Sequence, residues 1–146
     1  MRNVNTTRAF WPLFQHIKRR DIPMTTPVEM DYDGMLHNDR APDAWSMSFL
    51  YRTPDLGPAG DDGRIRVYDT QPVIVLSAGV RGDRSIESLN TALKQLDRWV
   101  ADHPEWRSSG DVRTFGYNGP NIRWWEVQIV LRPTQPDDTQ TPASAD

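Results

Sequence analysis

The sequence predicts one α+β domain, because two amphipathic helix patterns are interspersed with segments that alternate apolar and polar residues. The helix patterns cover 6–20 and 83–103. The clearest alternating segments are 24–32, 45–52, 112–117 and 123–132. A chain of 146 residues has the usual length of one domain. We therefore expect a mostly antiparallel sheet, or a distorted antiparallel barrel, with two helices packed on it.

Composition excludes several classes of function. The net charge of −3 creates no basic field that would attract nucleic acid. The absence of cysteine excludes disulfides, thiolate catalysis and cysteine-based zinc sites. No apolar run is long enough to span a bilayer, and residues 1–5 lack the hydrophobic core of a signal peptide. We therefore expect a soluble, cytoplasmic protein without a membrane span.

The first helix is predicted from an apolar stripe at spacings of 3, 4 and 7, formed by Phe10, Leu13, Phe14 and Ile17. Pro12 predicts either a later start near Ala9 or a kink. The helix ends in three cations that suit its C-terminus and that alternatively clamp the carboxylates of a ligand, Lys18, Arg19 and Arg20.

The next two strands are predicted to pair antiparallel. Pro23 and Pro27 hold the chain extended on both sides of Met24. One face of segment 24–32 then carries Met24, Thr26, Val28, Met30 and Tyr32. Segment 45–52 places Trp45, Met47, Phe49 and Tyr51 on one face. These Met and aromatic faces either line a pocket or are covered by the first helix.

The middle of the chain contains the second helix. Residues 53–63 are rich in proline, glycine and aspartate, which predicts a loop, and 64–68 predicts a short edge strand. The apolar run 73–80 predicts a strand buried on both faces. In the helix 83–103, apolar residues recur every three or four positions, Ser85 is a candidate N-cap, and His103 is expected to cap the C-terminus.

The last strands complete the expected order. Segment 112–117 places Arg113, Phe115 and Tyr117 on one face. Segment 123–132 places Trp125 and Val127 on one face and Trp124 and Glu126 on the other. The domain is expected to cover 6–132, with disordered ends at 1–5 and 133–146.

The element order suggests a duplicated βαββ unit. The second half reads strand, helix, strand, strand, and the first half has this order without its leading strand. A missing first strand leaves an unpaired sheet edge, through which the protein is expected to form a homodimer or to take a partner strand.

Several motifs, in this order, resemble those of the SOUL/haem-binding protein family. They are Phe10-x-x-Leu13-Phe14-x-x-Ile17, Ile22-x-Met24-Thr25-x-Pro27-Val28, Trp45-x-Met47-x-Phe49, Tyr117-Asn118-x-Pro120 and Arg123-x-x-Glu126-Val127. The match spans roughly residues 8 to 132, and its Met-Thr-x-Pro-Val element is fairly specific.

The resemblance implies a distorted β-barrel of two βαββ-like repeats, related to bacterial effector-binding domains. It also implies binding of haem or another tetrapyrrole in an apolar surface pocket without one universal axial ligand. The chain departs from the family pattern because the strands before the first helix are missing. Trp124 and Trp125 also stand where the family has Arg-Asn.

The expected function is therefore non-catalytic binding of haem or another flat apolar ligand. The expected ligand-binding residues are Met24, Met47, Phe49, Tyr51, Phe115, Tyr117, Trp124 and Glu126, with Lys18, Arg19 and Arg20 meeting propionates. His16 is the candidate iron ligand, since imidazole is a common axial ligand.

Two alternatives stay open. In the first, an effector-binding-like module acts as a hydrolase with Glu126 as base and Tyr51 or Tyr117 as acid. If its face of the strand is buried, Glu126 needs a partner, for which Arg52 and Arg113 are the candidates. In the second, the protein is an interaction module that binds a partner through the open sheet edge.

Overall fold

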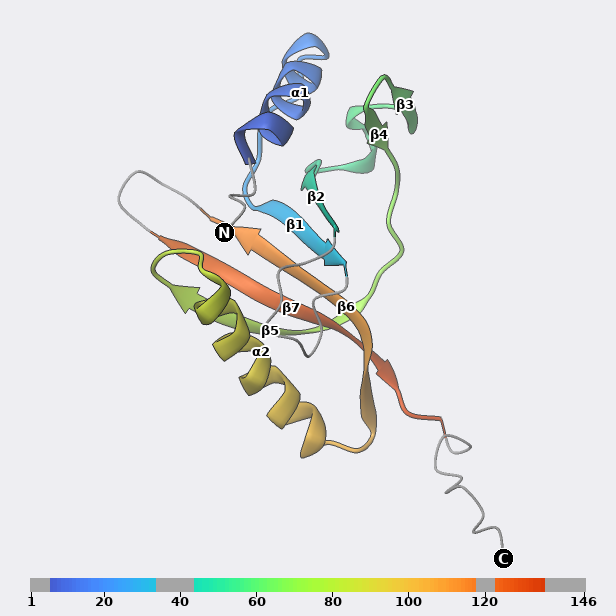
Figure 1. The fold of residues 1–146 in the computed structure, drawn as a ribbon. Coiled ribbons are helices and arrows are strands. Elements are labelled where there is room, and N and C mark those ends of the chain that lie inside the picture. The colour runs from blue at the N-terminus through green and yellow to red at the C-terminus, as the bar shows by residue number, and fades with distance from the viewer. Residues whose placement is uncertain (1–5, 34–43, 118–122, 136–146) are drawn as a thin grey trace, which may run out of the picture.

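The computed structural model describes residues 6–33, 44–117 and 123–135, which form an α+β domain around a five-stranded sheet (Figure 1). The strand order is β2-β1-β6-β7-β5, and every neighbouring pair is antiparallel. The strands are β1 (Val28–Asp33), β2 (Ala44–Phe49), β5 (Ile74–Arg81), β6 (Trp106–Gly116) and β7 (Trp124–Pro133). Because β2 and β5 are edges, the sheet is open, and the expected alternative of a closed barrel is wrong.

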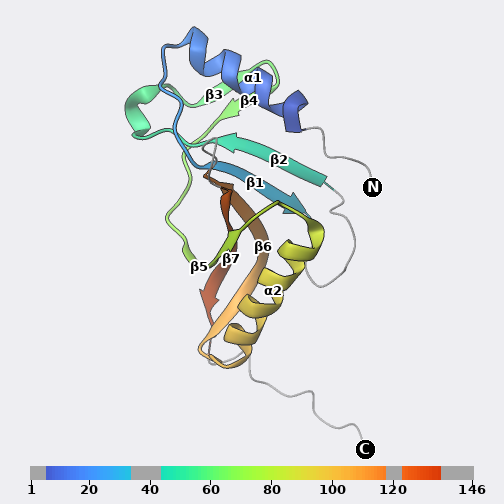
Figure 2. The ribbon, with the colours of Figure 1, turned by 90° about the vertical axis from the view of Figure 1, so that its left-hand side faces the viewer.

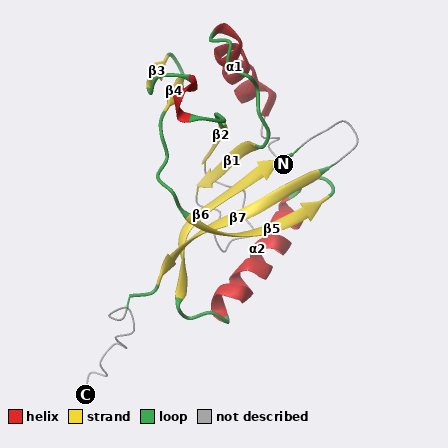
Figure 3. Ribbon diagram, turned by 180° about the vertical axis from the view of Figure 1, so that it is seen from behind, coloured by secondary structure: helices red, strands yellow, loops and turns green. Residues whose placement is uncertain are grey.

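Two helices and a small hairpin complete the fold. Helix α1 (Thr6–Arg19) and the hairpin of β3 (Gly60–Asp62) and β4 (Ile65–Val67) lie beyond β2, whereas α2 (Ile86–Ala101) lies along β6 and β7 (Figure 2). The ring of Phe10 on α1 packs against Phe49, 5.3 Å between centroids. Phe49 lies opposite Val28 of β1, and the same row of the sheet continues through β6 to Trp125 of β7. Residues in one row point to the same face, and Trp125 packs against α2. Both helices therefore cover the same face, and no described helix covers the opposite face (Figure 3).

The main core lies between α2 and the sheet. Every second residue of β7 points into it, and Val127 and Ile129 have no exposed surface. The stripe of α2 that meets them is Leu89, Ala92, Leu93 and Leu96. The predicted N-cap is confirmed, since the side chain of Ser85 accepts a hydrogen bond from the backbone of Ser88 at 3.1 Å. At the other end His103 Nδ1 donates to the Trp99 carbonyl at 2.7 Å, which confirms its capping role.

The predicted pairing of the two Met and aromatic faces is confirmed. Met30 lies opposite Met47, and Tyr32 lies opposite Trp45. Strand β1 begins at Val28, however, and Met24 precedes it with 43% of its surface exposed. The Thr26–Pro27 peptide between them is cis.

Three further expectations are corrected. The segment 53–63 is not simply a loop, because it contains the 3-10 turn Pro54–Leu56 and strand β3, which pairs with β4. Strand β6 begins at Trp106 rather than at 112 and has an irregular register between Ser108 and Val112. Strand β5 is an edge strand with solvent-exposed alternate residues, so burial on both faces was wrong.

The ends of the predicted domain lie partly outside the described residues. Strand β7 continues to Pro133, and the backbone of Thr134 donates to the Glu105 carbonyl at 2.9 Å. The expected disorder of residues 1–5 and 136–146 concerns parts of the chain that the structure does not describe. Among the described helices, none is long and apolar enough to cross a membrane.

Candidate functional site: a cleft at the free edge of β2

A cleft of about 700 Å³ lies between α1, the free edge of β2 and strand β4 with the segment that follows it. Its apolar lining comes from three elements: Pro12, Leu13 and Ile17 of α1, Met47 and Phe49 of β2, and Ile65 and Val67 of β4. Four cations, Arg8, Arg52, Arg64 and Arg66, and two carboxylates, Glu29 and Asp69, also line it. The cleft is thus apolar in part, with more cationic than anionic side chains.

The sequence of α1 explains how the helix forms one wall. Phe10 stacks on Phe14 at 5.8 Å between ring centroids and contacts Phe49, which anchors the helix on the covered sheet face. The side chains one position earlier on successive turns, Leu13 among them, lie at the cleft. Pro12 falls inside the helix without ending it. The expectation that α1 covers Phe49 is therefore confirmed, and the cleft opens beside that contact.

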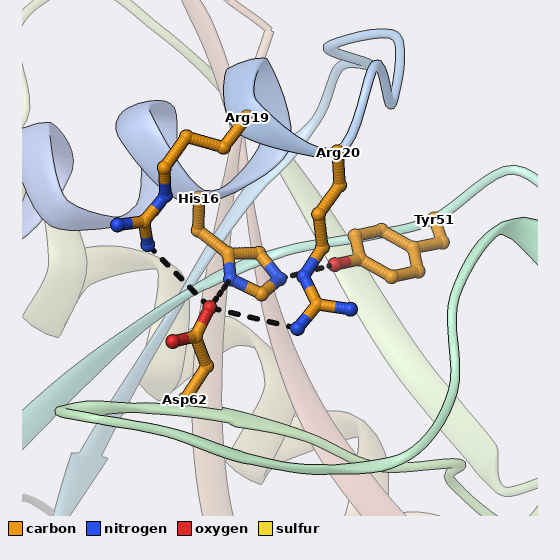
Figure 4. A network of polar contacts seen from close by, with 5 residues as sticks. All are labelled: His16, Arg19, Arg20, Tyr51 and Asp62. Atoms are coloured by element: carbon orange, nitrogen blue, oxygen red, sulfur yellow. Dashed lines mark hydrogen bonds and ion pairs between the residues drawn. The ribbon is translucent and has the colours of Figure 1, made fainter.

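A buried histidine connects α1 to the hairpin and to the cleft (Figure 4). The ring of His16 is 2% exposed, and its Nδ1 lies 2.7 Å from Asp62 Oδ2 on β3. Its Nε2 lies 3.1 Å from the Tyr51 hydroxyl, just after β2. Arg19 and Arg20 approach the same carboxylate oxygen at 3.4 and 3.7 Å. One carboxylate thus gathers three cationic or polar groups from the C-terminal turn of α1.

The chemistry of these side chains determines which atom donates and which accepts in each hydrogen bond. A carboxylate only accepts, so Nδ1 of His16 donates to Asp62, and in the neutral ring Nε2 accepts from the hydroxyl of Tyr51. The hydrogen bond from His16, assisted by Arg19 and Arg20, lowers the pKa of Asp62 despite partial burial. Burial raises the pKa of Tyr51, with Arg20 opposing it, so Tyr51 stays a neutral phenol at physiological pH. The network therefore places a neutral phenol at a cleft whose other walls are partly apolar.

A second polar network crosses the sheet face that carries no described helix. Arg113 donates to Glu29 at 3.1 Å and to Gln128 at 3.2 Å. Gln128 in turn donates to Glu126 at 3.0 Å, and Ser77 donates to Glu126 at 3.3 Å. The expected partners of Glu126, Arg52 and Arg113, are thus replaced by neutral donors.

Burial, with a smaller contribution from neighbouring charges, raises the pKa of two groups on this sheet face. Burial, followed by the charge of Asp31, raises the pKa of Glu29, and Arg113 opposes the shift. Burial also raises the pKa of Tyr117, with further increases from the charge and the hydrogen bond of Glu126. Glu29 also lines the cleft, so the second network touches one side of it.

The structure divides the predicted ligand-binding residues into two groups. Met47, Phe49, Tyr51 and the candidate iron ligand His16 line the cleft. Phe115, Tyr117, Trp124 and Glu126 belong to the opposite sheet face, and Met24, Lys18, Arg19 and Arg20 do not line the cleft. Arg19 and Arg20 instead approach Asp62. Both nitrogens of His16 already lie within hydrogen-bond distance of protein oxygens, so iron ligation requires one of those bonds to break.

Sequence reasoning missed several residues of the cleft and of the His16 network because they come from segments classified as loop or edge strand. Asp62 lies in the predicted loop, and Arg64 and Arg66 lie in the predicted edge strand. His16 and Asp62 are 46 residues apart, so no periodic pattern in the sequence connects them. The available signal was the helical position of His16, one residue before Ile17 of the apolar stripe.

Two further findings are negative. The described part of the chain holds no group of three or more His, Asp or Glu side chains that could bind a metal ion. In comparisons with known proteins, no family model, no curated protein and no solved structure matches the chain.

Proposed function

We propose that the protein is a non-catalytic binding module whose cleft takes a flat, largely apolar molecule with acidic groups, such as haem or another tetrapyrrole. The observation that carries the proposal is a cleft of about 700 Å³ with an apolar lining and four arginines. Small-molecule sites are typically clefts of about 300–1,000 Å³ with a few polar groups among apolar ones. A ring system would lie against Met47 and Leu13, and its carboxylates would meet arginine guanidinium groups.

The arginines support an anionic rather than a neutral ligand. Within the described residues, Arg52 and Arg64 form no ion pair, whereas Arg66 pairs with the exposed Asp61 at 3.3 Å. Arg52 and Arg64 are therefore the cations that a ligand can pair without breaking an existing contact. We therefore assign to Arg52 and Arg64 the pairing with the acidic groups of the ligand, which the sequence suggested for Arg19 and Arg20.

The residues fit the ring of a tetrapyrrole better than they fit its iron. The imidazole of His16 is engaged on both sides, and the hydroxyl of Tyr51 bonds to it. Haem would supply an iron centre when bound, but the side chains described here recognise the apolar ring and the acidic groups. We therefore expect metal-free protoporphyrin IX to bind about as tightly as haem.

Titration of purified protein with protoporphyrin IX, followed by tryptophan quenching and porphyrin absorbance, tests the proposal. Protoporphyrin IX dimethyl ester, which lacks the two negative charges, should bind about tenfold more weakly. The double variant Arg52→Glu/Arg64→Glu should lose a similar factor, and Arg132→Glu, an exposed charge reversal on β7, should not. Equal affinity for the acid and the ester, or no saturable binding, would reject it.

The same titration tests the predicted ligation by His16. If haem binds about a hundredfold more tightly than the metal-free ring, and His16→Ala removes that difference, His16 is an iron ligand after all. If both ligands bind alike and His16→Ala changes neither spectrum, the histidine has the structural role that its two hydrogen bonds indicate.

A hydrolase remains the second candidate, because the hydroxyl of Tyr117 donates a hydrogen bond to Glu126, and the two groups are an acid and a base on the open sheet face. Tyr51, the other proposed acid, belongs to the His16 network instead. Any hydrolytic activity found for this chain should fall by about a hundredfold or more in Glu126→Gln. Unchanged turnover would remove this candidate.

We also propose that the two halves are βαββ repeats of one kind, although the described residues of the first half include no strand before α1. In the second half, β5 pairs with the outer edge of β7, and α2 packs beneath both. In the first half, α1, β1 and β2 follow the same order, and β2 pairs within the described residues only with β1. The position equivalent to β5 is the free edge of β2.

A further inference from the structure

We propose that the cleft is also a strand-insertion site, in which an acidic, extended segment of a partner protein pairs with the free edge of β2. The proposal goes beyond small-molecule binding because it uses the backbone edge of β2 and names a macromolecular partner. Its four supports are the unpaired edge, the width of the gap, the apolar floor and the charge of the lining.

Among the described residues β2 pairs only with β1, so its other edge is open to pairing. Its sequence, Ala44-Trp-Ser-Met-Ser-Phe49, contains neither a charged residue nor a proline. Those are the residues with which proteins usually protect an edge from further pairing. Every residue from Ser46 to Phe49 lines the cleft, so the cleft runs along the strand rather than over one face of it.

Strand β4 flanks the same cleft as β2 without pairing with it. Each Cα atom of β4 lies more than 8 Å from every Cα atom of β2. Neighbouring strands in a sheet are about 4.8 Å apart, so two strands that flank a third are about 9.6 Å apart. The separation of β2 and β4 therefore excludes direct pairing of the two strands and is compatible with one strand between them.

Helix α1 supplies the floor on which such a strand would rest. Ala9, Leu13 and Ile17 recur at i+4 and line the cleft between β2 and β4. In the second half of the chain, α2 packs against β5 in the same way, through Leu76, Ala78 and Val80. Alternate apolar side chains of the inserted strand would thus contact α1.

Charge identifies the class of partner. Four arginines and two carboxylates line the cleft, and Arg52 and Arg64 have no ion pair within the described residues. The alternate side chains that face away from α1 are therefore expected to be acidic. A second copy of this chain is a poorer occupant, because its own β2 is uncharged and is flanked by α1 and β4.

Strand β5 gives the length and direction of the occupant. It has eight residues and runs antiparallel to β7, the counterpart of β2. The matching occupant is an eight-residue segment, antiparallel to β2, with alternating acidic and apolar residues. We expect main-chain hydrogen bonds to supply affinity and the alternating side chains to supply specificity.

The experiment uses an acetylated octapeptide of alternating glutamate and valine, labelled with fluorescein, and measures fluorescence anisotropy with the full chain. We expect saturable binding at physiological salt. Three peptide controls separate the contributions: lysine in place of glutamate, the same residues in two blocks, and N-methylation of alternate residues. Each should bind at least about tenfold more weakly, because each removes charge pairing, alternation or backbone donors respectively.

Protein variants and hydrogen exchange locate the site. Arg52→Glu/Arg64→Glu should weaken binding about tenfold, and Arg132→Glu should leave it unchanged. Amide protection on peptide binding should be confined to β2, β4, helix α1 and the residues that flank them. Equal binding of the N-methylated or block peptide, or protection elsewhere, would overturn the proposal.

Two further outcomes also decide the question. Dimerisation in sedimentation experiments that protects β2 in the absence of peptide would assign the edge to a second copy and overturn the proposal. Binding of protoporphyrin IX without binding of the octapeptide would reject the strand site and leave the proposed small-molecule function intact. Binding of the octapeptide without binding of protoporphyrin IX would support the strand site and reject the proposed small-molecule function.

Discussion

Removing the hydroxyl of Tyr51 tests whether the His16 network holds α1 in place. In Tyr51→Phe the ring that contributes to the cleft remains, and the hydrogen bond from the hydroxyl to His16 Nε2 at 3.1 Å is lost. His16 is 2% exposed, so its nitrogen becomes a buried polar atom without a partner. Such an atom costs about 1–3 kcal/mol, with the lower value expected if water from the cleft reaches it. For a chain of this size that corresponds to a melting temperature lower by roughly 3–12 °C.

The assay is urea unfolding followed by tryptophan fluorescence, with Tyr68→Phe as the matched control. Tyr68 also lines the cleft, but it is 60% exposed and its hydroxyl has no partner among the described residues. The control should change the free energy of unfolding by less than about 0.5 kcal/mol. If the two variants are equally stable, His16 and Tyr51 are not coupled and the network does not stabilise α1. A double-mutant cycle with Asp62→Asn should show non-additive losses, because all three groups share His16.

Three other predictions concern the core, the close contact between Gly116 and Arg84, and the second polar network. Ile129→Ala should lower the free energy of unfolding by about 2–5 kcal/mol in urea melts, because Ile129 is fully buried beneath α2. Gly116→Ala should displace the guanidinium of Arg84, which occupies the space of the new methyl group, and a crystal structure should show its new position. Glu29→Gln should make stability less favourable relative to the wild type as pH falls from 7 to about 4. Burial raises the pKa of Glu29, so ionisation costs stability above the folded pKa, and protonation relieves that cost only in the wild type. Parallel pH curves, measured by urea unfolding, would contradict the direction of that shift.

Local patterns were sufficient to predict the helices and the pairing of the first two strands. The period of two in 24–32 and 45–52 placed Met30 and Met47 on faces that meet, and the observed register puts them opposite each other. Apolar spacing and the Ser85 cap located α2 within three residues at each end. These features depend on residues close in the sequence, and the apolar periodicity and helix capping that predict them also stabilise them in the folded chain.

The site depends on contacts that local patterns do not contain. His16 meets Asp62 across 46 residues, and Arg113 meets Glu29 across 84. Hairpin β3–β4 was missed because glycines with positive φ, here Gly60 and Gly63, are typical of loops and also of a tight hairpin with a two-residue turn. The apolar run in β5 suggested two buried faces, yet composition alone does not distinguish an edge strand that packs one face on a helix.

The two helices differ in what holds them against the sheet, and this difference leaves a cleft in the first half of the chain. Helix α2 buries its stripe against three strands, so apolar packing with β5, β6 and β7 stabilises it. Within the described residues, helix α1 contacts only β2 and the β3–β4 hairpin, and Leu13 remains partly exposed at the gap between β2 and β4. A polar network from His16 to Asp62 links this helix to the hairpin, where the second half has a strand. Polar bonds fix geometry without filling volume, so the first half keeps a cleft in which a ligand or a strand can supply the missing apolar contacts.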